Sequence, residues 1–414
     1  MRVSRPIVLV YTAGFLRSLG IGLLGVVLGV YLSRIGFSAT RIGFVLAAGL
    51  AGIAASTAFT SVLGDRFGRK RTLLLLTLLT AGGGVALGRL HSLTGLLPLA
   101  FVAMVNGMGT DRSAIFALEQ AILPGLVRDE KRTWTLAWYN VLLDGGGAVG
   151  SLAAGLPIFL HHQFGTAILM AYQFVFFGYT ALNLGIFVLY LLLPETIEVA
   201  TRGTPAPPVS PETKRTVHRM AALFGLDSLG GGFLGDALVA YWFFKRFGLV
   251  EQKLGLLFFV VRILNALSHL GAAWLSRKIG LVNTMVFTHL PSSLFLICVP
   301  LMKSPLGAIA FFLARESLVE MDVPTRQSYV AAVVKPHERT YASGVTNLTR
   351  TVAWAVSSSV AGAVMQYLAF SAPLVLGGSM KIAYDILLFR GFRKLKPPEE
   401  VSKPSSTPKV PMRS

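Results

Sequence analysis

The chain has 414 residues, of which 53% are hydrophobic and only 14% are charged. A soluble protein carries about 25% charged residues, so this composition excludes an ordinary soluble enzyme and indicates an integral membrane protein. The formal net charge of +19 does not indicate nucleic-acid binding, because the basic residues lie in short clusters between apolar segments.

Twelve apolar segments long enough to cross a bilayer follow one another along the chain. A spanning helix needs about 20 apolar residues, and backbone polar groups find no water in lipid, so each segment must be helical. The predicted spans are residues 7–33, 40–62, 72–89, 93–120, 134–160, 165–193, 219–243, 253–275, 281–302, 305–331, 340–369 and 372–391. The sequence therefore predicts an all-α integral membrane protein with twelve transmembrane helices.

The basic clusters predict the orientation of these spans. They occur in every second loop, and loops rich in lysine and arginine face the cytoplasm. The clusters lie near residues 2–5, 66–71, 128–132, 214–219, 277–278, 335–339 and from 390 onward. We therefore expect a multi-pass protein of the inner or plasma membrane with both termini in the cytoplasm. The loop that contains Lys245, Arg246 and Lys253 departs from the pattern.

A stretch rich in proline, threonine and charge separates six spans from six. We expect an N-terminal half at 1–193, a cytoplasmic linker at 194–219, a C-terminal half at 220–391 and a disordered cytoplasmic tail at 392–414. The halves also repeat in sequence. At an offset of 207 residues Gln120 and Asn140 match Gln327 and Asn347, and at an offset of 210 Gly22 matches Gly232. Ordered matches of this kind predict a duplicated six-helix unit.

The turn between the second and third spans carries a charged motif, Ser61-Val-Leu-Gly-Asp65-Arg66-Phe-Gly68-Arg69-Lys70. With Ser61 in place of the first glycine, it resembles the G-x-x-x-D-R-x-G-R-K signature of the major facilitator superfamily. The resemblance implies two six-helix halves that transport a small solute by alternating access. It also implies that Asp65, Arg66, Gly68 and Arg69 form a latch for the outward-facing conformation. A basic loop that only sets the topology is the alternative.

The fifth span carries small residues at four-residue spacing within residues 146–155, Gly146-x-x-x-Gly150-Ser151-x-x-Ala154-Gly155. This stretch resembles the antiporter motif of the same superfamily. Small residues at this spacing also let two helices approach closely, so packing alone explains them equally well. The fourth span has no arginine in residues 103–107, where proton-coupled drug antiporters of the superfamily carry one.

Ionisable residues within the spans are the strongest candidates for function. A charge at the centre of a membrane helix costs about 2.5–3.5 kcal/mol and needs a partner or a water-filled cavity. Arg17, Asp144, Asp227 and Arg350 lie at one depth, roughly 12–15 Å from the cytoplasmic ends of their spans. Our hypothesis pairs Arg17 with Asp144 and Asp227 with Arg350. The alternative pairs Arg17 with Asp227 across the halves.

The tenth span is unusually charged. Glu316 and Glu320 share a helix face, and two neighbouring carboxylates repel each other unless one holds a proton, which suits a proton-coupling site. A self-neutralising network is the alternative. The resemblance implies that spans 1, 4, 7 and 10 line the cavity. The candidate substrate and proton residues are therefore Arg17, Asp111, Arg112, Asp227, Asp236, Arg315, Glu316 and Glu320. We expect Lys381 and Asp385 to form a local ion pair.

These observations predict a secondary active transporter, coupled to protons and acting in efflux. An uptake symporter for an organic anion or metabolite, or a membrane sensor or lipid-handling protein on the same fold, are the alternatives. The expected partners are a small solute, protons and the bilayer, without nucleic acid, and the expected state is a monomer. Cys298 is the single cysteine, and the sequence shows no nucleotide-binding loop, catalytic set or metal-ligand spacing. We therefore expect no enzymatic activity, cofactor or metal.

Overall fold

The computed structural model describes residues 4–111, 113–128, 132–198, 209–334 and 338–392, and within these ranges it contains helices and no strand. The N-terminal half holds α1 (Arg5–Arg34), α2 (Ala39–Phe67), α3 (Arg69–Leu87), α4 (Leu93–Val102), α5 (Ala114–Ile122), α6 (Arg132–Ala153), α7 (Leu156–Phe164) and α8 (Ile168–Leu191). The C-terminal half holds α9 (Pro211–Gly232), α10 (Asp236–Phe247), α11 (Glu251–Ile279), α12 (Leu281–Cys298), α13 (Pro305–Val319), α14 (Asp322–Val333), α15 (Arg339–Tyr367) and α16 (Ala372–Phe392). The predicted all-α fold is confirmed.

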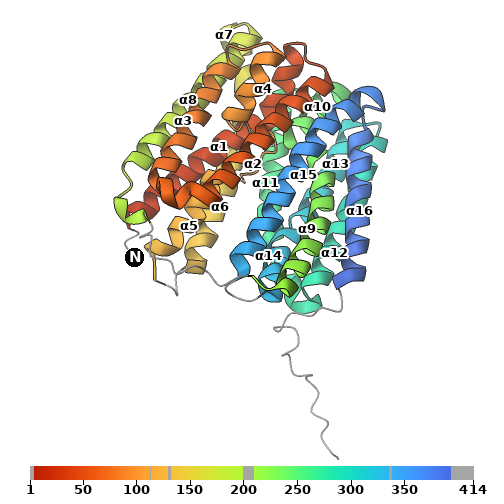
Figure 1. The fold of residues 1–414 in the computed structure, drawn as a ribbon. Helices are drawn as coiled ribbons and strands as arrows, with labels where there is room; N and C mark the ends of the chain where they lie inside the picture. Colours follow the sequence, from red (N-terminus) through yellow and green to blue (C-terminus); the bar gives the residue numbers. More distant parts are fainter. Residues whose placement is uncertain (1–3, 112, 129–131, 199–208, 335–337, 393–414) are drawn as a thin grey trace, which may run out of the picture.

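The two halves lie side by side (Figure 1), with α1–α8 on one side and α9–α16 on the other. The start of α1 and the end of α16 lie at the same end of the bundle, which we call the terminal end. Since α1 runs away from this end, Arg34 at its last turn marks the opposite, distal end.

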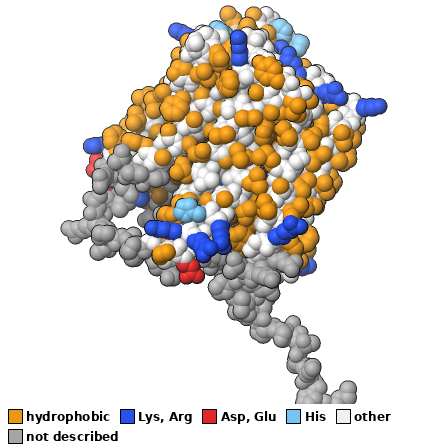
Figure 2. Space-filling view, turned by 45° about the vertical axis from the view of Figure 1, so that its right-hand side comes forward, with side chains coloured by type: hydrophobic (Ala, Val, Ile, Leu, Met, Phe, Trp, Pro, Cys, Tyr) orange, Lys and Arg blue, Asp and Glu red, His pale blue; other side chains and the backbone are white. Residues whose placement is uncertain are grey.

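The surface of the bundle suits a lipid environment. Among the described residues, nine helical segments are long and apolar enough to cross a membrane. Figure 2 shows apolar side chains over the middle of the visible face and lysine and arginine side chains towards its two ends. Large apolar side chains such as Phe287 and Trp274 are more than half exposed, as expected for residues that face lipid rather than water.

Four of the predicted spans are interrupted rather than continuous. The helix pairs and the residues between them are α4–α5 (103–113), α6–α7 (154–155), α9–α10 (233–235) and α13–α14 (320–321). In Figure 1, α4 lies above α5, α10 above α9 and α13 above α14. Irregular backbone at membrane depth is tolerated only where it is buried in protein or lines a cavity. The α4–α5, α9–α10 and α13–α14 interruptions each contribute a lining residue to one interior cavity, namely Met108, Leu234 and Glu320.

The break between α4 and α5 is stabilised by its own residues. The Asn106 side chain donates to the Thr110 carbonyl oxygen at 2.8 Å and accepts from the Met108 amide at 2.9 Å. Gly109 adopts a φ of 76°, in the left-handed region that glycine tolerates without strain. Ser113 then caps α5 by accepting from the Phe116 amide. These contacts satisfy backbone groups that a continuous helix would have bonded internally.

The small residues of the fifth span pack α6 against α1. A Cβ atom at Gly150 would lie 1.9 Å from the Leu19 carbonyl oxygen, and one at Gly146 would lie 2.3 Å from that of Phe15. The C-terminal half repeats this contact between α9 and α15, where a Cβ at Gly232 would lie 1.9 Å from Ser357 Oγ. Close helix packing therefore explains this motif without reference to antiport.

The stretch predicted as a linker is partly helical. α9 begins at Pro211, with Ser210 as its N-cap, so the last residues of the predicted 194–219 linker belong to the first helix of the C-terminal half. The middle of the linker (199–208) and the predicted tail beyond Phe392 lie outside the described residues.

Candidate functional site

The N-terminal half contains a buried ionic cluster centred on Arg17 of α1. Its Nε lies 2.5 Å from Asp111 Oδ2, and its Nη2 lies 2.5 Å from Glu119 Oε2. The hydroxyls of Tyr139 and Tyr190 donate to the two oxygens of Glu119, at 2.5 and 2.7 Å. Glu119 is fully buried, so these donors compensate for its lost hydration.

The predicted pair of Arg17 with Asp144 is therefore wrong in this conformation. Asp144, on α6, instead lies within electrostatic range of Glu320, Arg262 and His269 in the C-terminal half. The prediction used depth in the membrane alone. Rotation about the helix axis decides the partner, because Arg17 points towards α5 while Asp144 points across the interface between the halves.

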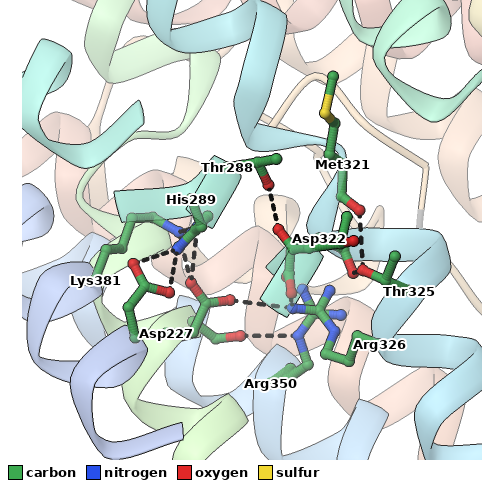
Figure 3. A network of polar contacts seen from close by, with 12 residues as sticks. Asp227, Thr288, His289, Met321, Asp322, Thr325, Arg326, Arg350 and Lys381 are labelled. Atoms are coloured by element: carbon green, nitrogen blue, oxygen red, sulfur yellow. Dashed lines mark hydrogen bonds and ion pairs between the residues drawn. The ribbon is translucent and has the colours of Figure 1, made fainter. Parts of the chain in front are cut away.

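The C-terminal half contains a second cluster, drawn in Figure 3, in which side chains from several helices converge on Asp227 of α9. Lys381 Nζ lies 2.6 Å from Asp227 Oδ1, and Arg326 Nη1 lies 3.4 Å from Asp227 Oδ2. Arg326 also pairs with Asp322, four residues earlier on α14. His289 Nε2 lies 3.6 Å from Asp227 Oδ1. The cluster joins α9, α12, α14 and α16.

One further predicted pair needs correction. Arg350 lies close enough to Asp227 to act on it through its charge, in line with the predicted pair, and its Nε also donates to Ser228 Oγ at 3.1 Å. Asp227 also forms ion pairs with Lys381 and Arg326. The predicted local pair of Lys381 with Asp385 is wrong, because the Asp385 carboxylate bonds to His289 Nδ1 at 3.0 Å.

The two clusters occupy equivalent positions in the sequence repeat, with the charges exchanged. Arg17 and Glu119 of the first half match Asp227 and Arg326 of the second, at offsets of 210 and 207 residues. Each aligned pair is an ion pair in the structure. Comparing the repeats as pairs would have revealed this arrangement, because a charge reversal at one member is matched by a reversal at the other.

A cavity of about 100 Å³ lies at the level where the interrupted helices meet. The Ala237 amide at the start of α10 donates to the Gly107 carbonyl oxygen in the α4–α5 break, at 3.0 Å. Asp236 pairs with Arg262 of α11, and both side chains lie against Gly109, where a Cβ atom would lie 1.8 Å from Asp236 Oδ2. Backbone of the N-terminal half thus covers an ion pair of the C-terminal half.

The lining of this cavity is strongly charged and comes mainly from the C-terminal half. The N-terminal half contributes Met108 and Thr110. The ionisable lining residues are Asp227, Asp236, Arg262, His289, Arg315, Glu316, Glu320, Asp322, Arg326, Arg350 and Lys381. They include five carboxylates and five lysine or arginine side chains, so the lining is close to neutral overall while offering both signs of charge.

Five predicted cavity residues line this cavity, namely Asp227, Asp236, Arg315, Glu316 and Glu320. Arg17 and Asp111 lie in the separate Arg17 cluster, and Arg112 lies outside the described residues. Sequence reasoning missed His289 and Asn265 as lining residues. A signal for His289 was present, because it is the single histidine in the span 281–302, which contains no Asp, Glu, Lys or Arg.

The structure describes only part of the predicted latch, namely Gly68 and Arg69. The side chains of Asp65 and Arg66 lie outside the described part of the structure. Gly68 has a φ of 96° and is the N-cap of α3. The amides of Arg69 and Lys70 donate to the Glu198 carboxylate at 2.7 and 3.0 Å. A carboxylate at this position compensates the unsatisfied amides of a helix N-terminus, so the turn is tied to the chain that follows α8.

The two halves are in direct contact at the distal end. Arg34 of α1 makes two bonds to the Glu251 carboxylate of α11, at 2.7 and 3.0 Å, and Tyr172 of α8 donates to the same group. Nearby, a Cβ at Gly362 of α15 would lie 2.1 Å from the Ala39 carbonyl oxygen of α2. Glu251 is fully buried. The structure is therefore closed at the distal end.

Comparison with known proteins agrees with this architecture. The chain is 25% identical over 418 residues to the uncharacterised membrane protein YJR124C of Saccharomyces cerevisiae, covering 93% of each chain. Among solved structures it resembles the nucleoside transporter NupG (TM-score 0.71, 12% identity, 93% and 98% coverage). It also resembles a D-xylose-proton symporter (0.72, 15%, 93% and 97%) and the human organic anion transporter MFSD10 (0.61, 17%, 93% and 99%).

At these identities the solved structures show a shared fold and no more. A family model described as Major Facilitator Superfamily matches residues 10–318. The match spans well over half of the chain and includes the Ser61–Lys70 motif, the α6 packing motif and most of the charged cavity. The chain is therefore a multi-pass membrane protein that belongs to the major facilitator superfamily.

Proposed function

We propose that this protein is a secondary active transporter, rather than an enzyme, which moves a small hydrophilic solute by alternating access coupled to protons. The observation that carries the proposal is the charged cavity between the halves, bounded by the breaks of α4–α5, α9–α10 and α13–α14. Discontinuous helices at mid-membrane are where transporters bind their solutes. At about 100 Å³ the cavity is small beside the roughly 300–1,000 Å³ of drug-sized pockets, which favours a small metabolite.

Three carboxylates around Arg262 supply the proposed proton site. Asp236 pairs with Arg262 directly, and both Asp144 and Asp236 lie within electrostatic range of Glu320. Several carboxylates near one arginine repel one another, and a proton bound at any of them relieves the repulsion. The group replaces the predicted Glu316–Glu320 pair, because Glu316 pairs with its neighbour Arg315.

The proposed proton site also joins the two halves. Asp144 belongs to the N-terminal half, whereas Glu320, Asp236 and Arg262 belong to the C-terminal half. A rocking motion of one half against the other changes the distance between Asp144 and the remaining carboxylates. Proton binding and conformation are thereby linked, as coupled transport requires.

The predicted orientation in the membrane shows which side of the protein the closed distal end faces. With both termini in the cytoplasm, the distal end faces outside, so the closed Arg34–Glu251 end gives an inward-facing conformation. We propose export, with uptake symport as the alternative, and the two orientations of the pH gradient in the assay below distinguish these directions.

Reconstitution into proteoliposomes tests the proposal. A panel of small metabolites is assayed for counterflow and for accumulation driven by an imposed pH gradient, in both orientations of the gradient. We expect Glu320→Gln to abolish accumulation and to retain counterflow. Glu212→Gln, at an exposed position of α9, is the matched control and should behave like the wild type. A panel in which no solute moves, or accumulation that ignores pH, would contradict coupled transport.

A further inference from the structure

Four buried polar atoms with no hydrogen-bond partner lie in side chains that line the cavity. They are Arg262 Nε, Arg315 Nε, Asn265 Oδ1 and Asp322 Oδ1. Their side chains belong to residues that are at most 9% exposed. Among the described side chains only Thr60 and Tyr384 carry further atoms of this kind, so the unpartnered groups gather in this one cavity.

Such atoms are costly to leave without partners. A buried donor or acceptor that lacks its hydrogen bond costs about 1–3 kcal/mol, and proteins seldom keep several together without a ligand or water to satisfy them. The cavity is polar and large enough to hold water. A solute that replaces this water must offer acceptors to the two unpartnered donors and donors to the two unpartnered acceptors. The four atoms therefore indicate which chemical groups the solute carries.

The two donors indicate an anionic group. Arg262 is held by Asp236 through Nη2, and Arg315 is held by Glu316 through Nη1. In each case the carboxylate fixes the side chain and leaves Nε without a partner. Guanidinium groups form their strongest bonds with carboxylate and phosphate oxygens.

The two acceptors indicate a cationic or strongly donating group. Asn265 follows Arg262 by three residues on α11, which places both on one helix face. Asp322 bonds to Arg326 through Oδ2 and leaves Oδ1 without a partner. A carboxylate oxygen and an amide oxygen in the lining of one cavity suit a protonated amine, which donates several hydrogen bonds and carries the compensating charge.

We propose that the cavity binds a small zwitterion, with its carboxylate or phosphate at Arg262 and Arg315 and its ammonium group at Asn265 and Asp322. The solute class rests on the transport function proposed above. All four residues lie in α11, α13 and α14, so the C-terminal half identifies the solute while the N-terminal half covers it at Met108 and Thr110.

Thermal unfolding of the purified protein in detergent tests the solute class. The probes are α-amino acids and phosphoethanolamine, each beside its deaminated acid or alcohol phosphate and its amine lacking the anionic group, with glucose and uridine as neutral compounds. We expect at least one zwitterion to raise the unfolding midpoint, and its two single-charge counterparts to bind about tenfold more weakly or worse. Equal stabilisation by a neutral compound or a single-charge counterpart, or no effect from any zwitterion, overturns the proposal.

Single-residue variants distinguish a loss of solute binding from a loss of folding. Arg315→Gln should weaken the zwitterion about tenfold or more, whereas Arg246→Gln, at an exposed position of α10, should not. Asn265→Asp keeps an acceptor and should retain binding, whereas Asn265→Leu should lose it, and neither removes an ion pair. Equal affinity in the Asn265→Leu and wild-type proteins contradicts the assignment.

Failure of the zwitterion assignment and failure of the transport proposal give different results. If zwitterions bind but neither solute nor protons move in proteoliposomes, the solute class stands and the transport function fails. If a neutral or purely anionic solute is accumulated with a pH gradient, transport stands and the zwitterion assignment fails.

Discussion

At the scale of single residues, Arg17 and Asp227 are each compensated by partners within their own half. Arg17 is enclosed by Asp111 and Glu119, and Asp227 is enclosed by Lys381 and Arg326. Sequence analysis identified Arg17 and Asp227 as buried ionisable residues but assigned Arg17 the wrong partner. Depth along a helix can be counted from a sequence, whereas the direction of a side chain depends on how neighbouring helices are rotated.

Charge exchange at Arg17 tests this arrangement. Removing one partner of a buried ion pair costs about 3–5 kcal/mol, so Arg17→Asp should sharply reduce the yield of folded protein. The double variant Arg17→Asp/Glu119→Arg should recover much of it, because it copies the polarity of Asp227 and Arg326 in the second half. Fluorescence-detected size-exclusion chromatography with a heating step measures both yield and stability.

The control for that experiment is the double variant Arg17→Asp/Asp144→Arg, which tests the pairing expected from sequence. It should remain as unstable as Arg17→Asp alone, because Asp144 faces α11. Better rescue by the Asp144→Arg substitution than by Glu119→Arg would contradict the observed pairing.

At the scale of helices, the interruptions within predicted spans shape the cavity. The segment between α4 and α5 touches the start of α10 through Gly107 and Ala237, and it covers the Asp236–Arg262 pair through Gly109. Counting apolar residues predicted one continuous helix over 93–120. Such a count depends on hydrophobicity and contains no information on the backbone hydrogen bonds of the segment. Asn106, Gly107 and Gly109 provided a local signal, since glycine and asparagine favour non-helical backbone.

Gly109→Ala tests whether this break positions the ion pair. A Cβ there would lie 1.8 Å from Asp236 Oδ2, at a φ of 76° that alanine disfavours. We expect loss of most transport activity, about tenfold or more for a displacement near 1 Å at the site, with folded protein still recovered. Gly82→Ala in α3 is the control, because nothing lies within 4 Å of its added Cβ. Equal transport by the two variants would show that the Gly109 contact is dispensable.

At the scale of the whole molecule, two duplicated halves meet tightly at the distal end. Arg34 and Tyr172 of the first half enclose Glu251 of the second, and α2 packs on α15 beside them. The alternating access proposed above requires this contact to open, so we propose that the Arg34–Glu251 contact is the gate at the distal end. Sequence analysis predicted the duplication and the resemblance to transporters, but it did not single out Arg34 or Glu251, because both lie at helix ends where charged residues are ordinary.

Glu251→Gln tests the closure. The substitution leaves Arg34 without its carboxylate in the closed state, at a cost of about 3–5 kcal/mol, and should therefore shift the population towards opening at the distal end. Spin labels at His162 and Lys303, exposed distal positions on opposite halves, report this as longer distances in double electron–electron resonance after Cys298 is replaced by serine. Arg41→Gln, exposed on α2, is the control. An unchanged distance distribution would exclude the proposed gate.

The membrane class, the helical fold, the duplication and the resemblance to the superfamily could all be predicted from residue order, because hydrophobic length, internal repeats and the Ser61–Lys70 motif are properties of that order. The sequence also identified Asp227, Asp236, Arg315, Glu316 and Glu320, which line the cavity. Which charges form pairs and where the helices break became known from the folded structure. Partner choice depends on the rotation and approach of helices far apart in the chain, and the Arg17–Glu119, Asp227–Lys381 and Arg34–Glu251 pairs join residues about a hundred or more positions apart.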